Sequence, residues 1–227
     1  MEQDRFQLFP ILLSVAMVIT ISVLTLLFVS TLFIPAWQEF LNIDNPWYCS
    51  LFILFLCPLI GLVRLPVAIR FNGIQGSANM LSTIVPLAIL AYTYPSSHIN
   101  WSPFTYVPGA LSLILYWICS VPSEKGAYLY RISIPIGTIS SILIIQAFIG
   151  SNLQAFLWIA FASQFIPLLL VETIRTSQST KLYHEDDQFI LGGKGAHDPL
   201  WVAPSFAVFL TYSTHLLFWS LKAPPFG

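Results

Sequence analysis

Charged side chains are scarce in this chain. Lys and Arg number 9 and Asp and Glu number 10 among 227 residues, so only 8% of the residues are charged, against about 25% in soluble domains. So few charges cannot cover the surface of a soluble globule, which excludes a water-soluble protein. The net charge of −1 excludes nucleic acid as a partner, because neutralising phosphates requires a basic surface.

Cysteines are few as well. Cys49, Cys57 and Cys119 are odd in number and lie in or beside apolar stretches, which excludes a disulfide framework and a Cys-x-x-Cys metal site. We expect them to be small buried side chains. Residues 184–187 (His-Glu-Asp-Asp) offer nitrogen and oxygen ligands, but their pattern is typical of a solvated acidic loop, so we predict no metal site.

Apolar residues, by contrast, are abundant. They make up 56% of the chain and the mean hydropathy is +0.78, whereas soluble proteins are roughly 45–50% apolar. Because a core cannot absorb this excess, part of it must face lipid. The composition therefore predicts an integral membrane protein whose first partner is the lipid bilayer.

The uncharged stretches predict about seven transmembrane helices, because about 20 apolar residues are needed to cross about 30 Å of hydrocarbon. Two stretches are of double length and break at polar turns near residues 95–103 and 150–152. The predicted spans are 6–38, 45–63, 78–94, 103–121, two within 132–171, and 199–221. We expect one all-α domain over residues 1–227, with residues 173–198 as a cytoplasmic loop between spans six and seven.

Helix-start residues support three of these boundaries. Asn45-Pro46, Ser102-Pro103 and Asp198-Pro199 each place a capping side chain directly before a proline. The cap oxygen accepts hydrogen bonds from backbone amides at the helix start, and proline at the first helical position lacks an amide that would need a partner. These pairs predict the starts of spans two, four and seven.

The basic residues predict the orientation. With the spans placed as above, every Lys and Arg except Lys222 falls on one side of the membrane, and basic residues are retained on the cytoplasmic side. The N-terminus is therefore predicted to be cytoplasmic and the C-terminus outside. Trp37, Trp47, Trp101 and Trp219 would then form an aromatic belt at the outer boundary.

Two glycine-rich segments lie on the predicted cytoplasmic side, one before span three and one before span seven. Each places flexible backbone and a nearby cation at a helix N-terminus, where free amides and the helix dipole favour an anion. They predict a site for an anionic headgroup or phosphate, and the alternative is that they are polar turns for close helix packing. The candidate residues are Arg70, Gly73, Gly76, Gly193, Lys194 and Gly195.

Residues 70–86 and 191–201 together resemble a prokaryotic polytopic membrane family catalogued as a domain of unknown function. Members of that family carry a Gly-Gly element before an Ile-Pro helix and a Gly-Gly-x-Gly-x-x-Asp element at the start of the last span. The resemblance implies a multi-pass protein of a prokaryotic cytoplasmic membrane, and it brings no known activity with it.

The second element is also distantly similar to the Gly-x-Gly-Asp motif of intramembrane aspartyl proteases. That similarity implies a catalytic pair of Asp198 and Glu172, in which one carboxyl is a base and the other an acid. The chain departs from the protease pattern, because two residues separate Gly195 from Asp198 and a Glu stands where an Asp is expected. The alternatives are a helix cap for Asp198 and a surface ion pair with Arg175 for Glu172.

Three classes of function follow. A non-catalytic component of a membrane complex, or a lipid-contacting scaffold with membrane-protein partners, accounts for the sequence without a special site and is our first expectation. A small transporter or channel is the second, since prolines within spans can break helices along a solute path. An intramembrane hydrolase that uses Asp198 and Glu172 is the third. Which cofactor, if any, the protein binds is unknown from the sequence.

Overall fold

The computed structural model describes residues 17, 20, 33–71, 74–123, 126–129, 133–148, 152–179, 189–192 and 198–222. The first predicted span, residues 6–38, is therefore described only at its C-terminal end and at two isolated positions. The acidic segment 184–187 lies outside the described residues.

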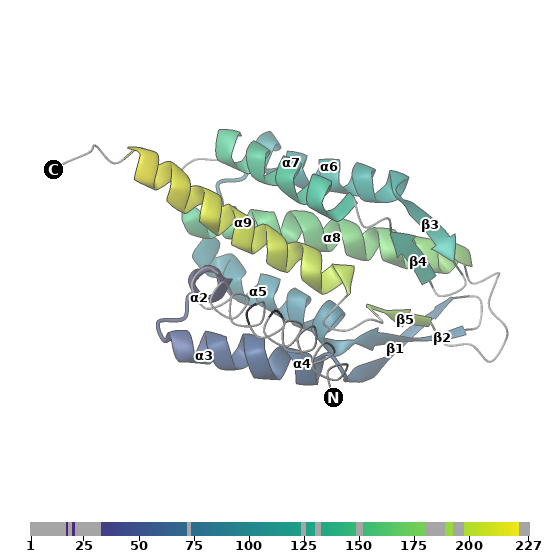
Figure 1. Ribbon diagram of the computed structural model, residues 1–227. Helices are drawn as coiled ribbons and strands as arrows, with labels where there is room; N and C mark the ends of the chain where they lie inside the picture. The colour runs from purple at the N-terminus through teal and green to yellow at the C-terminus, as the bar shows by residue number, and fades with distance from the viewer. Residues whose placement is uncertain are drawn as a thin grey trace, which may run out of the picture.

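Helices dominate the described chain, as the sequence predicts. α8 lies at the centre, with α6 and α7 on one side, α2 to α5 on the other and α9 packed along it (Figure 1). The helices are α2 (Ile34–Leu41), α3 (Pro46–Leu51), η2 (Phe52–Leu56), α4 (Cys57–Ile60), η3 (Met80–Ile84), α5 (Val85–Ser97), α6 (Pro103–Ile118), α7 (Ser133–Phe148), α8 (Leu153–Ser179) and α9 (Pro199–Lys222).

The three predicted helix starts are confirmed. α3 begins at Pro46, and the Asn45 side chain accepts a hydrogen bond from the backbone N–H of Trp47 at 3.0 Å. α6 begins at Pro103, where the N–H of Ser102 donates to Oγ1 of Thr105 at 2.9 Å. α9 begins at Pro199 after Asp198. Each boundary is set by local chemistry that the sequence displays.

Two helices accommodate a proline through a π turn. α3, η2 and α4 form one continuous helix, in which the N–H of Cys57, directly before Pro58, donates to the carbonyl of Phe52. In η3 and α5 the N–H of Val85, directly before Pro86, donates to the carbonyl of Met80. Proline removes one i to i−4 bond from a helix interior, and the widened turn keeps the preceding amide bonded.

Short strands join the helices at one end of the bundle, on the right in Figure 1. β1 (Arg64–Phe71) and β2 (Ile74–Asn79) are antiparallel, and β5 (Phe189–Leu191) adds to β2 in parallel. β3 (Ser120–Ser123) pairs with β4 (Gly126–Leu129). The described chain is mostly helical, as the predicted all-α domain requires, but that prediction missed these strands, in which short connections satisfy their backbone groups by pairing with one another.

The predicted cytoplasmic loop 173–198 is also partly wrong. α8 continues to Ser179, and residues 189–191 form β5. The charged residues after Val171 suggested a loop, but an amphipathic helix end tolerates charge once it leaves the apolar interior. α8 is therefore longer than the span that its apolar run predicts.

Trp37 is a core residue and not part of an outer belt, which corrects the prediction for that position. α2 is seen end-on in Figure 1 while α3 and α8 are seen from the side, so α2 crosses the bundle. Trp37 is 0% exposed and stacks on Trp201, with ring centroids 5.4 Å apart. Trp47 and Trp101 are exposed as predicted, and the side chain of Trp219 lies outside the described part.

Two described helices are long and apolar enough to cross a membrane, α8 over Leu153–Gln178 and α9 over Pro199–Leu217. α6 is apolar but shorter, at 16 residues. Helix length and composition in the described ranges therefore support two candidate spans and do not confirm the predicted seven.

Candidate functional site

The two glycine-rich segments are joined by the parallel pair of β2 and β5. Gly76 lies opposite Phe189 and Ala78 opposite Leu191, so the turn at Gly192 follows directly beside the strand that contains Gly76. Arg70 is in the neighbouring strand β1, in register with Gln75. The backbone thus brings Arg70 and Gly76 into one three-stranded sheet, and Gly192 lies in the turn directly after its third strand.

Gly192 occupies a turn that no other residue fits. Its φ of +66° is in the left-handed region, where glycine is favoured. An added Cβ would lie 1.9 Å from Oγ of Ser82 and 2.8 Å from its Cβ. The same serine donates a hydrogen bond to the carbonyl of Gly192 at 2.7 Å, within the protein interior. Conformation and space both therefore require glycine here.

Side chains from two helices hold this turn in place. Oε1 of Glu172, on α8, accepts a hydrogen bond from the N–H of Gly192 at 2.9 Å. Oγ1 of Thr83, on η3, donates to the carbonyl of Leu191 at 3.4 Å. The amide of Gly192, the residue before the predicted anion-site residue Gly193, is thus bound by a carboxylate of the protein itself.

Asn79 fixes the start of η3 beside the turn. It is buried, and its Oδ1 accepts hydrogen bonds from the amides of Leu81 and Ser82 at 3.0 and 3.2 Å. Its Nδ2 donates to the carbonyl of Gly61, at the end of α4, at 2.7 Å. One side chain therefore caps one helix at its N-terminus and another at its C-terminus. The sequence analysis did not single out this residue.

Asp198 is a helix cap, which confirms that interpretation. It is only 4% exposed, and its Oδ1 accepts a hydrogen bond from the amide of Leu200 at 3.0 Å. Its backbone carbonyl accepts from the amides of Trp201 and Val202, each at 2.9 Å. The carboxylate thus stabilises the first turn of α9, and a catalytic role for it stays a prediction.

Arg175 points to the end of α6 and not to Glu172. Its Nη2 donates to the carbonyl of Trp117 at 3.0 Å, and its Nε donates to Oγ of Ser120 at 3.1 Å. The guanidinium also lies over the Trp117 ring, 4.0 Å from the centroid. The i, i+3 spacing suggested an ion pair between Glu172 and Arg175. Arg175 instead makes contacts at the end of α6, because backbone carbonyls without a helical partner at a helix C-terminus attract a cation.

Several predicted site residues cannot be placed. Gly73, Gly193, Lys194 and Gly195 lie outside the described residues, and Arg70 is described in its backbone alone. Within the described ranges no three His, Cys, Asp or Glu side chains gather where they could hold a metal ion. The anion site stays a prediction. The pairing of β1, β2 and β5 places Arg70 and Gly76 near the turn at Gly192.

The most connected polar group in the interior is Gln164 on α8, which the sequence analysis missed. Its Nε2 donates to Oγ of Ser112 at 2.9 Å and to Oγ of Ser141 at 3.0 Å. Its Oε1 accepts hydrogen bonds from the hydroxyls of Tyr116 and Thr138. Both donors and both acceptor positions of the amide are used. The network therefore joins α6, α7 and α8.

Gly137 allows α6 and α7 to approach closely, whereas Gly109 has room for a methyl group. A Cβ on Gly137 would lie 3.3 Å from the hydroxyl oxygen of Tyr116, and a Cβ on Gly109 would lie 3.9 Å from Cα of Ser163. Small residues and interhelical hydrogen bonds are how helices associate in lipid. The isolated Ser163-Gln164 pair in an otherwise apolar run was the signal that could have indicated the network.

No family model matches the sequence, and comparisons with curated proteins and with solved structures found no match.

Proposed function

We propose that the protein is a multi-pass integral membrane protein of about seven spans that acts as a non-catalytic component of a membrane complex, in contact with lipid. In line with the family resemblance, we place it in the cytoplasmic membrane of a prokaryote. One observation carries the proposal. α6 and α7 bury most of their serine and threonine side chains and expose most of their large apolar ones, which is the reverse of a helix in a water-soluble protein.

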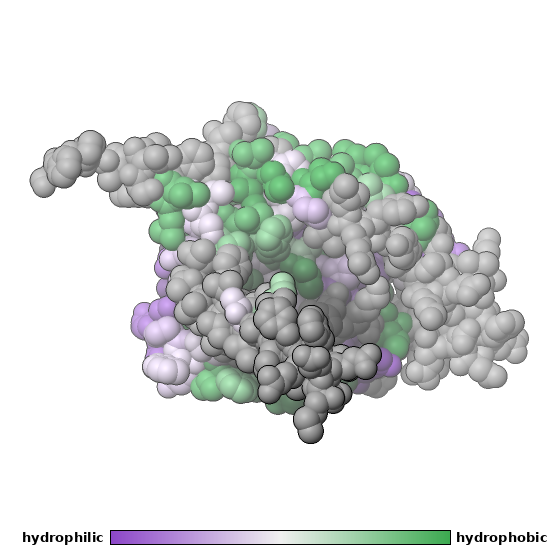
Figure 2. Space-filling model, viewed as in Figure 1, coloured by the Kyte–Doolittle hydropathy of each residue, from purple (hydrophilic) through white to green (hydrophobic). Residues whose placement is uncertain are grey.

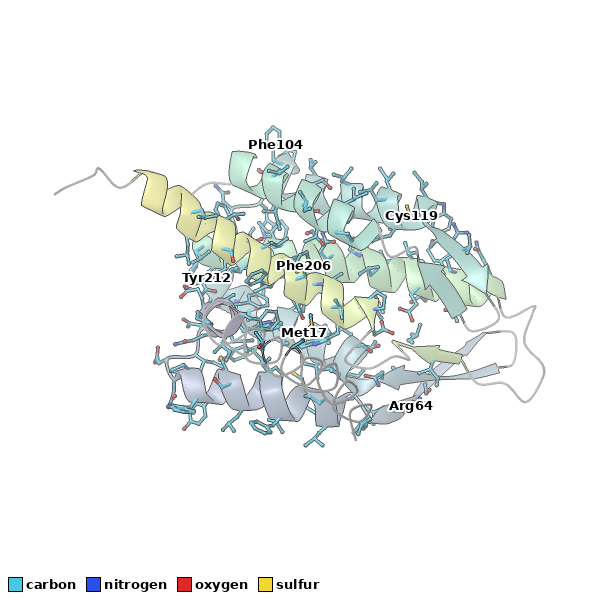
Figure 3. The ribbon with its side chains drawn as sticks, viewed as in Figure 1. Met17, Arg64, Phe104, Cys119, Phe206 and Tyr212 are labelled. Carbon is cyan, nitrogen blue, oxygen red and sulfur yellow. The ribbon has the colours of Figure 1, made fainter. Side chains whose placement is uncertain are left out.

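In α6 the inversion is seen in both halves of the helix, and Tyr106 is an exposed exception. Thr105, Ser112 and Tyr116 are buried, whereas Phe104 is 51%, Ile114 56% and Ile118 70% exposed. Phe104 points away from the bundle in Figure 3. Burying one such side chain is worth about 1.5–3 kcal/mol in water, so this arrangement would be costly in an aqueous protein. It costs little when the outer surface is lipid.

α7 repeats the pattern. Thr138 and Ser141 are buried, and Ile136, Ile139 and Leu143 are exposed, although Ile142 is buried and Ser140 only half-buried. The surface over α6 and α7, along the upper edge of Figure 2, is correspondingly mainly hydrophobic. Two neighbouring helices with the same inversion favour a shared apolar environment over two isolated exposed patches.

A structural role is favoured because the polar groups that could act chemically are used to hold the fold. Asp198 caps α9, and Glu172 binds the turn at Gly192. Gln164 uses its hydrogen-bonding capacity within the bundle. A fully connected polar network stabilises one helix arrangement, which suits a scaffold on which other membrane proteins assemble.

Membrane extraction followed by mild purification tests the proposal. We expect the protein to stay in the pellet under alkaline carbonate and to purify from native membranes with a stoichiometric membrane-protein partner. Recovery in the soluble fraction would reject the membrane location. A partner-free protein that hydrolyses a membrane peptide, and loses this activity on Asp198→Asn, would reject the structural role.

A second candidate is a cytoplasmic-face anion site, in a small transporter or channel. It is favoured by the pairing of β2 with β5, which places Arg70 and Gly76 near the turn at Gly192. Inorganic phosphate should then raise the thermal stability of the protein, and Arg70→Ala should abolish the effect. Arg64→Ala is the matched control, because it removes the same charge from the same strand. Equal stabilisation of both variants would reject this site.

A further inference from the structure

We infer that the outward face of α6 and α7 is covered by lipid acyl chains and not by a partner protein, with lipid headgroups at both ends of α6. The inference rests on the proposed membrane location, and it goes further by naming lipid as what covers this face. The face, called the α6–α7 face below, consists of Phe104, Val107, Leu113, Ile114, Ile118, Ile136, Ile139 and Leu143.

The size of its side chains favours lipid. Helices that pack on one another in membranes do so through small residues, which let the backbones approach. Here Gly109 and Gly137 lie next to Ser163 and Tyr116, while the α6–α7 face consists of large aliphatic and aromatic side chains, among which Ala110 is exposed and Ser140 half-buried. Flexible acyl chains fit such an uneven surface, and a rigid helix would leave gaps on it.

Aromatic rings mark one end of α6. Trp101 stacks on Tyr106 with ring centroids 5.4 Å apart, and it contacts Tyr94 at 6.5 Å and Trp158 at 6.1 Å. Trp101, Tyr94 and Tyr106 are all exposed. Tryptophan and tyrosine gather at the level of lipid headgroups, where the apolar ring and the polar edge both find a suitable environment.

An arginine and a tryptophan mark the other end. Arg175 lies over the ring of Trp117 and donates a hydrogen bond to the Trp117 carbonyl at the end of α6, while Trp117 remains 37% exposed. A planar guanidinium on an aromatic face, with its stem along apolar surface, is the arrangement of arginine at a membrane boundary. The two ends of the α6–α7 face thus each carry groups suited to headgroups, and the residues between them are apolar.

The length of α6 sets the thickness of this lipid layer. Its 16 residues rise about 24 Å at roughly 1.5 Å per residue, whereas an average bilayer has a hydrocarbon core of about 30 Å. A short span is accommodated by local thinning of the bilayer. The α6–α7 face should therefore be stabilised best by lipids with short acyl chains.

Nitroxide labelling of the full-length protein in phosphatidylcholine vesicles tests the occupant. The label is placed at Ile114→Cys or Leu143→Cys in a Cys119→Ser background, in which the remaining cysteines, Cys49 and Cys57, are buried. Asn100→Cys, in the exposed loop before α6, is the matched aqueous control. Oxygen concentrates in acyl chains and a water-soluble nickel chelate is excluded from them, so the two quenchers report lipid and water separately.

We expect the collision rate with oxygen to exceed that with the chelate several-fold at Ile114→Cys and Leu143→Cys, with the opposite order at Asn100→Cys. Low collision rates with both quenchers, in a complex purified from native membranes, would show a protein partner on this face and overturn the inference. High chelate access at Ile114→Cys would overturn it too. If the protein resists carbonate extraction in either case, the proposed membrane location still stands.

A second measurement varies the lipid. Thermal stability in short-chain phosphatidylcholine should exceed that in long-chain phosphatidylcholine of the same headgroup, because the longer chains do not match α6. An optimum in the longest chains would contradict the assigned thickness.

Discussion

Replacing Gly192 by alanine tests the turn on which the joined strands depend. The left-handed backbone costs a residue with a Cβ roughly 1–2 kcal/mol. The new methyl group would meet Oγ of Ser82 at 1.9 Å, so the serine must move and its hydrogen bond to the Gly192 carbonyl is lost. A buried hydrogen bond contributes about 1 kcal/mol, which gives a total loss of about 2–3 kcal/mol.

Thermal unfolding in detergent micelles, followed by circular dichroism, measures this loss. Since 1 kcal/mol shifts the Tm of a chain of this size by about 2–4 °C, the expected decrease is about 4–12 °C. Gly109→Ala is the matched control, because its Cβ would meet only Cα of Ser163 at 3.9 Å and alanine favours a helix by up to about 1 kcal/mol. It should leave the Tm unchanged or raise it.

The double variant Ser82→Ala/Gly192→Ala separates conformation from space. Removing the serine hydroxyl removes the closest clash, so the double variant should lose less stability than the sum of the two single variants. A Gly192→Ala protein as stable as wild type would refute the account of the turn. Additive losses would show that the clash with the Ser82 hydroxyl contributes nothing.

Three further substitutions follow from the same geometry. Asp198→Asn should keep the stability of the protein, because asparagine caps helices as well as aspartate, whereas Asp198→Ala should cost about 1 kcal/mol; equal loss in both variants would contradict the cap. Glu172→Gln should preserve the hydrogen bond from Gly192 through its amide oxygen, and Glu172→Ala should cost about 1–3 kcal/mol by leaving that amide unpaired; no difference in Tm between them would reject the contact. Gln164→Leu should lower stability by about 1–3 kcal/mol, because it leaves buried hydroxyls without their partner. Its control is Gln178→Leu, at an exposed position of the same helix. An equal loss of stability in the two variants would argue against the network.

What the sequence predicts well is local. Asn45, Ser102 and Asp198 precede the helices they were expected to begin, since a cap depends on residues within one turn. Gly76 and the segment at Gly192 were predicted to share a face, because the basic residues place both connections on one side of the bilayer. The pairing of β2 with β5 is consistent with that prediction.

What the sequence does not predict depends on distant partners. β5 has three residues and acquires its strand conformation from β2, more than a hundred residues earlier. Ser112, Ser141 and Gln164 are separately unremarkable polar residues, and their network exists only because α6, α7 and α8 converge. Trp37 has the residue type and the sequence position that are typical of a belt residue. It is buried because α2 crosses the bundle.

The parallel pair of β2 and β5 also has a consequence for biosynthesis. A ribosome adds about 5–20 residues per second, so β2 emerges roughly ten seconds before the strand that completes its second edge. Until then its amides and carbonyls are open to any other extended segment, which is the condition under which nascent chains mispair. In a chain truncated before Phe189, this edge of β2 would stay unpaired. We expect quality-control proteases to degrade such a chain.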